Sequence, residues 1–403
     1  MAVNTILDAD VIVKAGAALF KNNTPFIQSI DRQYDKSYEI AGAKQGDTIR
    51  IQRPIKATTR TGKVAQVQAR TEESVNLAVT SQIGVDMKFS SAELAQDIEP
   101  FTKRTLMPYI STLTSTIESN TMQSAYQATY QSVGTPGTDP ATWLVYGAAS
   151  AKLDNMAASQ MGRSVVLNPQ GRVATVDGLK GLFNPTRELS KQYISGNMGP
   201  AVGFDFSSTP NVRNHTTGTF AGTVLVDDAA IASGDSTIGM DAFTASAPAL
   251  TKGDVFTMAG VNAVNPLNKQ STGQLQQFTV TAAITGSSNE ITAVAFSPAM
   301  YSTGVLQNVD ALPADDAAVT FVGTESTAYA QNLAYQERAF TFATADLPLY
   351  GNTDFEARTV MDGVSMRIEK VIDGLNDDVY YRLDVLYGFA APVPEWAVRV
   401  QGA

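Results

Sequence analysis

Few residues in this chain have the types and spacing that catalysis needs. A Ser-His-Asp site would need His215 as its base, because the 403-residue sequence holds one histidine and no cysteine. His215 lies in the polar stretch 211–219, where an exposed histidine without a chemical role is the simpler interpretation. The same counts exclude zinc sites built from thiolates or from several histidines. Gly171 and Gly178 lack the spacing of a phosphate-binding loop.

The acidic pairs also have simpler explanations than catalysis or metal binding. Asp8 and Asp10 lie where an N-terminal helix would begin, and negative charge there complements the helix dipole. Asp227–Asp228 and Asp377–Asp378 are adjacent in the chain, so on a strand or tight turn their side chains point apart. Asn168 ends a predicted strand and is expected to cap the next helix. We therefore predict no catalytic residue, no metal site and no cofactor.

Charge is distributed unevenly along the chain, whose net charge is −10. Residues 221–325 contain ten acidic and two basic residues, a net charge of −8. Residues 44–70 contain seven basic residues and one acidic residue, a net charge of +6. This basic segment has no aromatic residue for base stacking, and the acidic chain repels a polyanion. We interpret it as an intersubunit contact first, a solvated hairpin second and a nucleic-acid surface third.

The longest predicted helix covers residues 97–133. Its apolar stripe repeats at steps of four, three and four, at Leu106, Ile110, Leu113 and Ile117. From periodicity alone, an ordinary core helix is the simpler interpretation. Pro108 does not suit a helix interior, because proline removes a backbone donor and clashes with the preceding turn. We therefore expect the helix to begin or kink at Pro108.

Alternating strands are expected on both sides of the basic segment, at residues 48–52, 75–80 and 83–89. Between them, residues 53–70 have too few apolar side chains to form a core of their own, so they should project as a long hairpin or loop. The remaining expected helices cover residues 5–21, 25–34, 141–159, 170–183 and 324–336, with a buried strand at 163–169.

Short strands separated by turns follow from residue 223, which predicts an inserted antiparallel barrel or sandwich. These six strands are expected at residues 223–226, 236–240, 254–261, 278–284, 290–296 and 318–322. The chain should close with a hairpin of two long alternating strands, at 364–372 and 379–389, and a last strand at 396–400.

Several short patterns, taken together in order and spacing, resemble one family. They are Asn22-Asn23, Arg32–Asp35, Ala43-Lys44, Gly46–Ile51, Arg53-Pro54, Gly84–Asp86, Ser91–Leu94, Lys252–Asp254, Ala259–Asn262, Leu386–Gly388 and Pro394-Glu395. Over nearly its full length the chain resembles the tailed-bacteriophage major capsid proteins, specifically the coat proteins of short-tailed phages that carry an inserted β-domain.

The resemblance implies an α+β fold, the tailed-phage major capsid fold, with a six-stranded antiparallel β-barrel inserted in it. It assigns an N-terminal arm (1–45), an extended loop that reaches over a neighbouring subunit (46–82), a spine helix region (83–135), an axial domain (136–221 and 326–360), the inserted barrel (222–325), and a peripheral-domain hairpin with the C-terminal strand (361–403).

The function implied is a major capsid protein that self-assembles into the icosahedral shell around phage double-stranded DNA. Its expected partners are many copies of itself in hexamers and pentamers, a scaffolding protein and a portal protein. Packaged DNA is expected only at non-specific proximity, and no membrane is expected. Assembly is expected in the host cytoplasm, and the product in the virion capsid.

Two groups of residues are the candidate contact sites. The basic segment would dock on acidic patches of the next subunit, through Arg50, Arg53, Lys56, Arg60, Lys63 and Arg70. The inserted domain offers an acidic contact loop with Asp227, Asp228 and Asp235, which is short for an intercapsomer role.

Two alternative functions stay open. One is another phage structural subunit, such as a decoration or tail tube protein. The other is a carboxylate hydrolase with a β-accessory domain, which needs two carboxylates converging in a cleft.

Overall fold

The structure is a computed structural model. It describes residues 20, 24–35, 48–57, 62–64, 67, 72–90, 107–179, 200–228, 230–349, 356–361, 364–373 and 378–403. The chain divides into two compact units. The first comprises Met1–Ile51, Val75–Thr121 and Phe340–Ala390, and the second comprises Gln52–Ser74, Met122–Ala339 and Ala391–Ala403.

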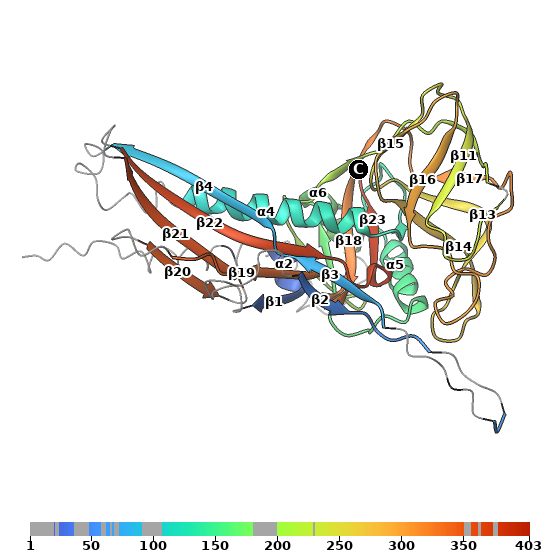
Figure 1. Ribbon diagram of the computed structural model, residues 1–403, viewed down its shortest axis with the longest axis horizontal. Coiled ribbons are helices and arrows are strands. Elements are labelled where there is room, and N and C mark those ends of the chain that lie inside the picture. The colour runs from blue at the N-terminus through green and yellow to red at the C-terminus, as the bar shows by residue number, and fades with distance from the viewer. Residues whose placement is uncertain are drawn as a thin grey trace, which may run out of the picture. The chain divides into compact units, whose positions relative to one another are not determined.

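A six-stranded sheet forms the first unit (Figure 1). Its order is β1 (Asp31–Asp35), β19 (Thr341–Ala345), β22 (Asp378–Ala390), β21 (Val364–Asp373) and β20 (Glu356–Met361), and β4 (Ser81–Ser90) also pairs with β22. β1 and β19 are parallel, whereas the other pairs are antiparallel. The predicted terminal hairpin is confirmed as β21 and β22. The strands expected at 48–52 and 75–80 are confirmed as β2 (Thr48–Gln52) and β3 (Ser74–Ala78), which pair with each other.

The long helix is α4, which covers Met107–Ala128. Pro108 is the second residue of α4 as the structure describes it, a position where a missing backbone donor costs nothing. The predicted stripe is the buried face: Ile110, Leu113 and Ile117 are at most 2% exposed. Leu106 and the rest of the predicted helix before residue 107 lie outside the described residues.

A buried carboxylate on α4 holds the short helix α2 (Pro25–Ser29). Glu118 is fully buried, and its Oε1 accepts the backbone N–H of Phe26 at 2.9 Å. This N–H belongs to the first turn of α2, where it has no intrahelical acceptor, so the carboxylate satisfies it. The helix expected over 25–34 is wrong in its second half, because residues 31–35 form β1 and pair with β19. The helix expected over 5–21 lies outside the described residues except for residue 20.

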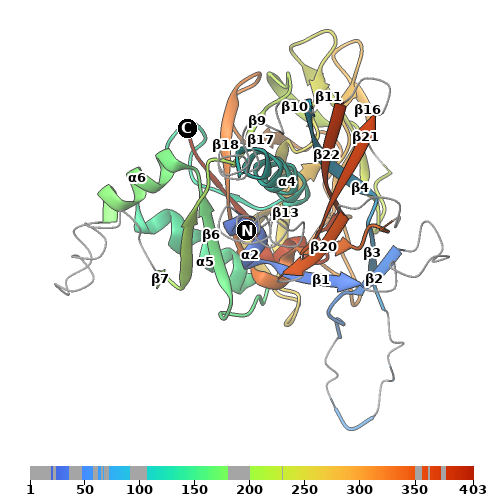
Figure 2. The ribbon, with the colours of Figure 1, turned by 90° about the vertical axis from the view of Figure 1, so that its left-hand side faces the viewer.

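A mixed seven-stranded sheet lies in the second unit, in the order β5 (Ser132–Val133), β23 (Ala397–Gln401), β18 (Ala328–Gln336), β6 (Arg163–Leu167), β8 (Phe204–Ser208) and β7 (Pro200–Ala201), with β9 (Asn214–Thr216) on β18. Helices α5 (Trp143–Asn155) and α6 (Pro169–Leu179) pack against it (Figure 2). Asn168 caps α6 as predicted, because its Oδ1 accepts the N–H of Gly171 at 2.9 Å.

The helix expected at residues 324–336 is wrong, because this stretch forms strand β18. β18 pairs with β23 on one edge and with β6 and β9 on the other. Residues 329–336 are all buried, so the strand lacks the apolar and polar alternation that marks a half-exposed strand. Its alanines and glutamines then favoured helix on propensity alone.

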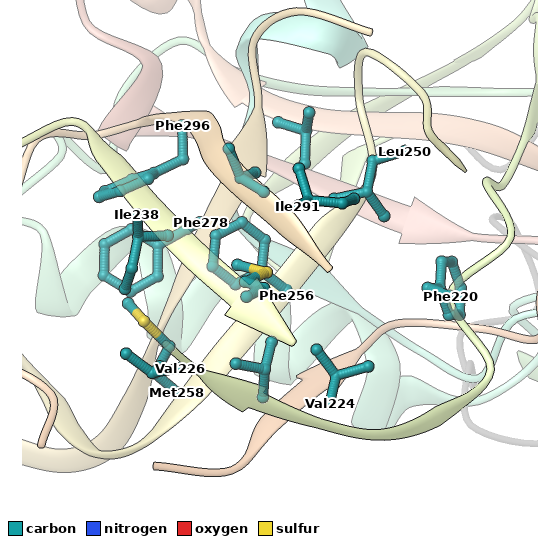
Figure 3. Packing of buried hydrophobic residues seen from close by; sticks show 14 of the residues in the cluster. Phe220, Val224, Val226, Ile238, Leu250, Phe256, Met258, Phe278, Ile291 and Phe296 are labelled. Atoms are coloured by element: carbon teal, nitrogen blue, oxygen red, sulfur yellow. The ribbon is translucent and has the colours of Figure 1, made fainter. Parts of the chain in front are cut away.

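The inserted barrel is confirmed as a near-closed six-stranded antiparallel sheet. Its order is β10 (Gly222–Val226), β11 (Thr237–Phe243), β16 (Ile291–Ser297), β14 (Ser271–Val280), β13 (Val255–Val264) and β17 (Val319–Phe321). Its interior is filled by aromatic and branched side chains (Figure 3). The rings of Phe256, Phe278 and Phe296 contact one another with centroids 5.2–6.0 Å apart. The six short strands therefore enclose a hydrophobic core of their own, built mainly from these aromatic and branched side chains.

The buried face of α4 yields a stability prediction. Leu113→Asp places a charge where the side chain is 1% exposed, so we expect it to unfold the subunit or to lower its free energy of unfolding by more than about 3 kcal/mol. Thr112→Ala, one residue away on the exposed face, should change it by less than about 0.5 kcal/mol. Urea denaturation followed by circular dichroism measures both, and equal effects would contradict the assignment of the two faces.

Candidate intersubunit contact surfaces

Two of the predicted basic contact residues pair within the subunit. Arg53 Nη1 lies 3.3 Å from Glu73 Oε2, and its Nε donates to the carbonyl oxygen of Pro392 at 2.6 Å. Lys56 Nζ lies 3.2 Å from Glu395 Oε1. The two basic side chains therefore fasten the start of the basic segment to the C-terminal stretch of the same chain.

The other predicted basic residues divide into two groups. Arg50, on β2, and Lys63 are exposed, and neither makes an ion pair with another residue that the structure describes. Arg60 and Arg70 lie outside the described residues. Exposed apolar side chains accompany Lys63: Val64 is 80% exposed and Val67 is 96% exposed. The described residues Lys63, Val64 and Val67 thus present both charge and apolar surface to solvent.

A hollow of about 190 Å³ lies beside the paired basic residues. Arg53, Lys56, Glu73 and Glu395 line it, together with residues of the barrel and Tyr130. The two acidic side chains already pair with the two basic ones, so each charge in the hollow is balanced. Among the residues that the structure describes, the lining of the hollow holds no carboxylate without a basic partner, whereas a hydrolase would use two such carboxylates.

The predicted acidic loop is held by turn hydrogen bonds. Asp228 Oδ1 accepts the N–H of Ala230 at 3.1 Å, and Asp235 Oδ2 accepts the N–H of Ala232 at 2.7 Å. Such side-chain to backbone bonds are common in aspartate turns. Asp227 is exposed and belongs to a different group, because its charge acts on Asp241 of β11. Asp228 and Asp235 thus hold the turn, and Asp227 is the exposed member of the three predicted residues.

Four aspartates concentrate negative charge on the barrel. Burial and the carboxylates of Asp227, Asp316 and Asp315 raise the pKa of Asp241. Asp241 Oδ1 has no hydrogen-bond partner among the residues described. Asp227, Asp315 and Asp316 are exposed, so their field reaches solvent.

The barrel is fastened to the rest of the second unit by a buried guanidinium. Arg399 of β23 is 1% exposed. Its Nε donates to the carbonyl oxygen of Thr129 at 2.7 Å, its Nη1 to that of Gly253 at 2.6 Å and its Nη2 to Thr279 Oγ1 at 3.0 Å. The guanidinium carbon also lies 5.5 Å from the ring centroid of Tyr126. One side chain thus joins the end of α4, the C-terminal strand and the barrel.

His215 is not the exposed residue that the sequence predicted. It is 6% exposed on β9, and its Nε2 lies 2.8 Å from Asp254 Oδ1. Asp254 is itself 2% exposed and also accepts the N–H of Gly218 and of Thr251. The polar composition of 211–219 suggested a solvated loop, but its pairing with β18 draws the histidine inside. The pair joins β9 to the turn before β13, and no serine is hydrogen-bonded to His215 in the described part of the chain.

Sequence reasoning missed this junction, formed by Tyr126, His215, Asp254 and Arg399. Its members come from four distant segments, and only Asp254 lies in one of the short patterns that the sequence shows. One signal was present: Arg399 interrupts the apolar positions of a short strand, and a charged residue in a buried strand must find partners. Glu118 gave a similar signal, as a lone carboxylate among the polar residues of α4.

A second contact between the helical layer and the barrel runs through Lys152 of α5. Lys152 Nζ donates to the carbonyl oxygen of Ser132 at 2.9 Å and to Gln277 Oε1 on β14. Gln277 Oε1 also accepts the N–H of Ser132 at 2.7 Å. Burial lowers the pKa of Lys152 to about 8. The ammonium group is hydrogen-bonded, but no described carboxylate pairs with it.

The described residues offer neither a metal site nor a membrane-spanning helix. No group of three His, Cys, Asp or Glu side chains there could hold a metal ion. Among the helices that the structure describes, none is long and apolar enough to cross a membrane.

Comparison with known proteins gives a family match over almost the whole chain. The model of the family described as "P22 coat protein - gene protein 5" matches residues 1–402. The search of curated proteins found no match.

Several solved structures are similar to the chain at low identity. One, titled "Mycobacterium phage Che8", is 11% identical over 94% of this chain and 91% of its own, with a TM-score of 0.46. The "Capsid structure of the Cyanophage P-SCSP1u" is 10% identical over 94% and 89%, with a TM-score of 0.47. The "CUS-3 coat protein I-domain" is 28% identical over 26% of this chain and 98% of its own, with a TM-score of 0.20.

The buried junction yields a second stability prediction. Arg399→Met leaves two buried carbonyl oxygens and a hydroxyl without their donor, so we expect the free energy of unfolding to fall by about 3 kcal/mol or more. Lys252→Met removes an exposed charge close to the junction and should have little effect. Thermal denaturation of both variants measures the difference. An Arg399→Met variant as stable as the parent would contradict the role of the junction.

Lys152 predicts a dependence of stability on pH. Because its pKa is lowered on folding, the folded state binds fewer protons than the unfolded state between about pH 8 and 10.5. This group therefore penalises the folded state below pH 8, and the penalty is relieved as pH rises. Relative to Lys152→Met, the parent should gain about 2 kcal/mol between pH 7 and pH 9.5. Urea denaturation at both pH values tests this, and a difference that stays constant would contradict it.

Proposed function

This chain belongs to the P22 coat protein family and is a major capsid protein that forms the shell of a bacteriophage, and we propose that its basic segment carries the contact that orders neighbouring subunits. Many copies of the chain assemble into that shell. The observation that supports our proposal is the division of the basic residues: Arg53 and Lys56 pair within the subunit, whereas Arg50 and Lys63 are exposed.

We assign the two halves of the segment different tasks. Arg53 and Lys56 fix where the segment leaves the subunit, because each pairs with a carboxylate that has a set place in the fold. Arg50 and Lys63, with Arg60 and Arg70, then provide charge for acidic patches on the next copy. Such complementary charges supply steering and register more than affinity. Weak contacts suffice in a shell, because each subunit makes many of them at once.

The domain roles follow the same proposal. Residues 1–45 act as an arm, 46–82 as the extended loop and 83–135 as the spine region. Residues 136–221 and 326–360 form the axial domain, and 361–403 complete the peripheral domain. The inserted barrel, 222–325, supports folding of the subunit, which fits its separate core and its buried attachment at Arg399. We place Asp227, Asp228 and Asp235 on its contact side, with Asp227 as the residue most available to a partner.

The proposed partners go beyond copies of the chain. Hexamers and pentamers assemble with a scaffolding protein and a portal protein in the host cytoplasm, and packaged DNA lies against the shell without sequence recognition. We assign the chain no catalytic role, because its one histidine is held in a structural pair. The acidic net charge agrees with weak DNA contact, since like charges repel.

Charge reversal tests the basic segment. We expect the double variant Arg50→Glu with Lys63→Glu to remain folded and to lose closed shells, because both exposed charges would then repel an acidic partner. The matched control, Lys252→Glu with Arg338→Glu, reverses two exposed charges elsewhere and should still assemble. Size-exclusion chromatography and negative-stain electron microscopy report the outcome. Normal shells from the first double variant would contradict the proposal.

A further inference from the structure

Lys152 of α5 is a half-buried amine that has no carboxylate partner among the residues described. Its Nζ donates to the carbonyl oxygen of Ser132 at 2.9 Å and to Gln277 Oε1. Lysine side chains are usually exposed, and those that are buried are usually paired with a carboxylate. The surroundings of Lys152 therefore oppose the charge that a lysine normally carries.

The hydrogen bonds at Lys152 Nζ suit the neutral amine. An ammonium group has three N–H donors, but the described acceptors are two, the Ser132 carbonyl oxygen and Gln277 Oε1. A neutral amine has two N–H donors and one lone pair, so these two acceptors satisfy its donors and leave the lone pair available. Gln277 Oε1 is itself fixed by the N–H of Ser132 at 2.7 Å. The lone pair is the part of an amine that attacks an electrophile.

Lys152 lines a small hollow between α5 and the hairpin of β13 and β14. Gln274 and Leu275 also line this hollow, and because both are exposed, solvent reaches it. Its volume of about 20 Å³ holds about one water molecule. An acyl group added to Lys152 Nζ must therefore be small.

The hollow is electrostatically neutral apart from the lysine. Among its described lining residues, Tyr130 is the other titratable group. Burial first, and then the carboxylate of Glu395, raise the pKa of Tyr130 well above its usual value, so its hydroxyl is neutral at pH 7. On the neighbouring elements, Asp154 pairs with Arg163, and Arg399 donates to other carbonyl groups.

Burial lowers the pKa of Lys152 to about 8. At pH 7 about one in ten of these amines is then neutral, compared with about one in three thousand for an ordinary lysine. The protonation of Lys152 thus agrees with its hydrogen bonding, since both leave a nucleophilic amine beside a hollow that solvent reaches.

We propose that Lys152 is a nucleophilic modification site, which takes a small acyl group from a donor of the acyl phosphate class. The neutral Nζ attacks the carbonyl carbon of the donor, so that a C–N bond forms and the bond from that carbon to the phosphate oxygen breaks. The amine proton leaves with the phosphate, and no oxidant or reductant is needed. The product is an uncharged amide, which retains one N–H donor and removes a charge that burial opposes.

Limited acetylation of the full-length protein tests the proposal. Acetyl phosphate is the donor, and peptide mapping by mass spectrometry measures the rate of acetylation at each lysine. At pH 7 we expect Lys152 to react about tenfold faster than the exposed Lys252, because part of an advantage of about 300-fold in neutral amine is lost to burial. The rate at Lys152 should level off above about pH 8, where most of the amine is already neutral.

Gln277→Glu is the matched variant, because it preserves the shape of the side chain and adds a carboxylate beside Lys152 Nζ. The opposite charge favours the ammonium form, so acetylation of Lys152 at pH 7 should fall to the rate of Lys252 or below. Gln270→Glu adds the same charge at an exposed position outside the lining and should leave the rate unchanged. In urea, Lys152 and Lys252 should react equally, because the fold supplies the difference.

Four results would each overturn the proposal. The first is acetylation of Lys152 no faster than that of Lys252 at pH 7, and the second is a rate at Lys152 that rises steadily to about pH 10, as for an ordinary exposed amine. The third is an unchanged rate in a Gln277→Glu variant whose circular dichroism matches the parent. The fourth is a difference between the two lysines that persists in urea. Should Gln277→Glu fail to fold, the pH profile of the parent still decides.

Discussion

The fold of the second unit depends on one buried cation. A guanidinium that leaves water loses its hydration, and that loss is tolerable only when its donors are hydrogen-bonded. Arg399 meets this condition with acceptors at Thr129 just after α4, on the turn before β13 and on β14, which lie 120 to 270 residues away in the chain. The inserted barrel is therefore fixed by specific directional bonds and not by apolar contact alone. Burial lowers the pKa of Arg399, but Asp254 and the ring of Tyr126 favour its charged form.

The same principle separates structural charges from contact charges in this subunit. Charges that must hold a position are buried or half-buried and paired, as in Arg53 with Glu73 and Lys56 with Glu395. Charges that remain exposed, such as Lys63 on the basic segment and Asp316 on the barrel, keep their hydration until a partner arrives. A shell protein needs both kinds. In our proposal, paired charges set the geometry of each subunit, and exposed charges of opposite sign select and orient the neighbour.

Periodicity predicted the elements that have one buried face. The stripe of α4, the terminal hairpin and most barrel strands were visible in the sequence, because half-exposed elements alternate. β18 was mistaken for a helix because burial on both faces removed that alternation. The junction residues were not predictable, since only the tertiary fold brings Tyr126, Asp254 and Arg399 together. The basic segment was recognised from its composition, but the pairing of Arg53 and Lys56 depends on the C-terminal stretch, more than 300 residues away.

The chain is a subunit of a closed shell, so the size of its assemblies is the most direct test. Sedimentation velocity of the full-length protein, co-expressed with its neighbouring genes, measures that size, and electron microscopy of the fastest fraction shows its form. We expect sedimentation to show megadalton particles, and electron microscopy to show that their outline is uniform and closed. A small discrete oligomer under the same conditions, with no particles, would contradict it.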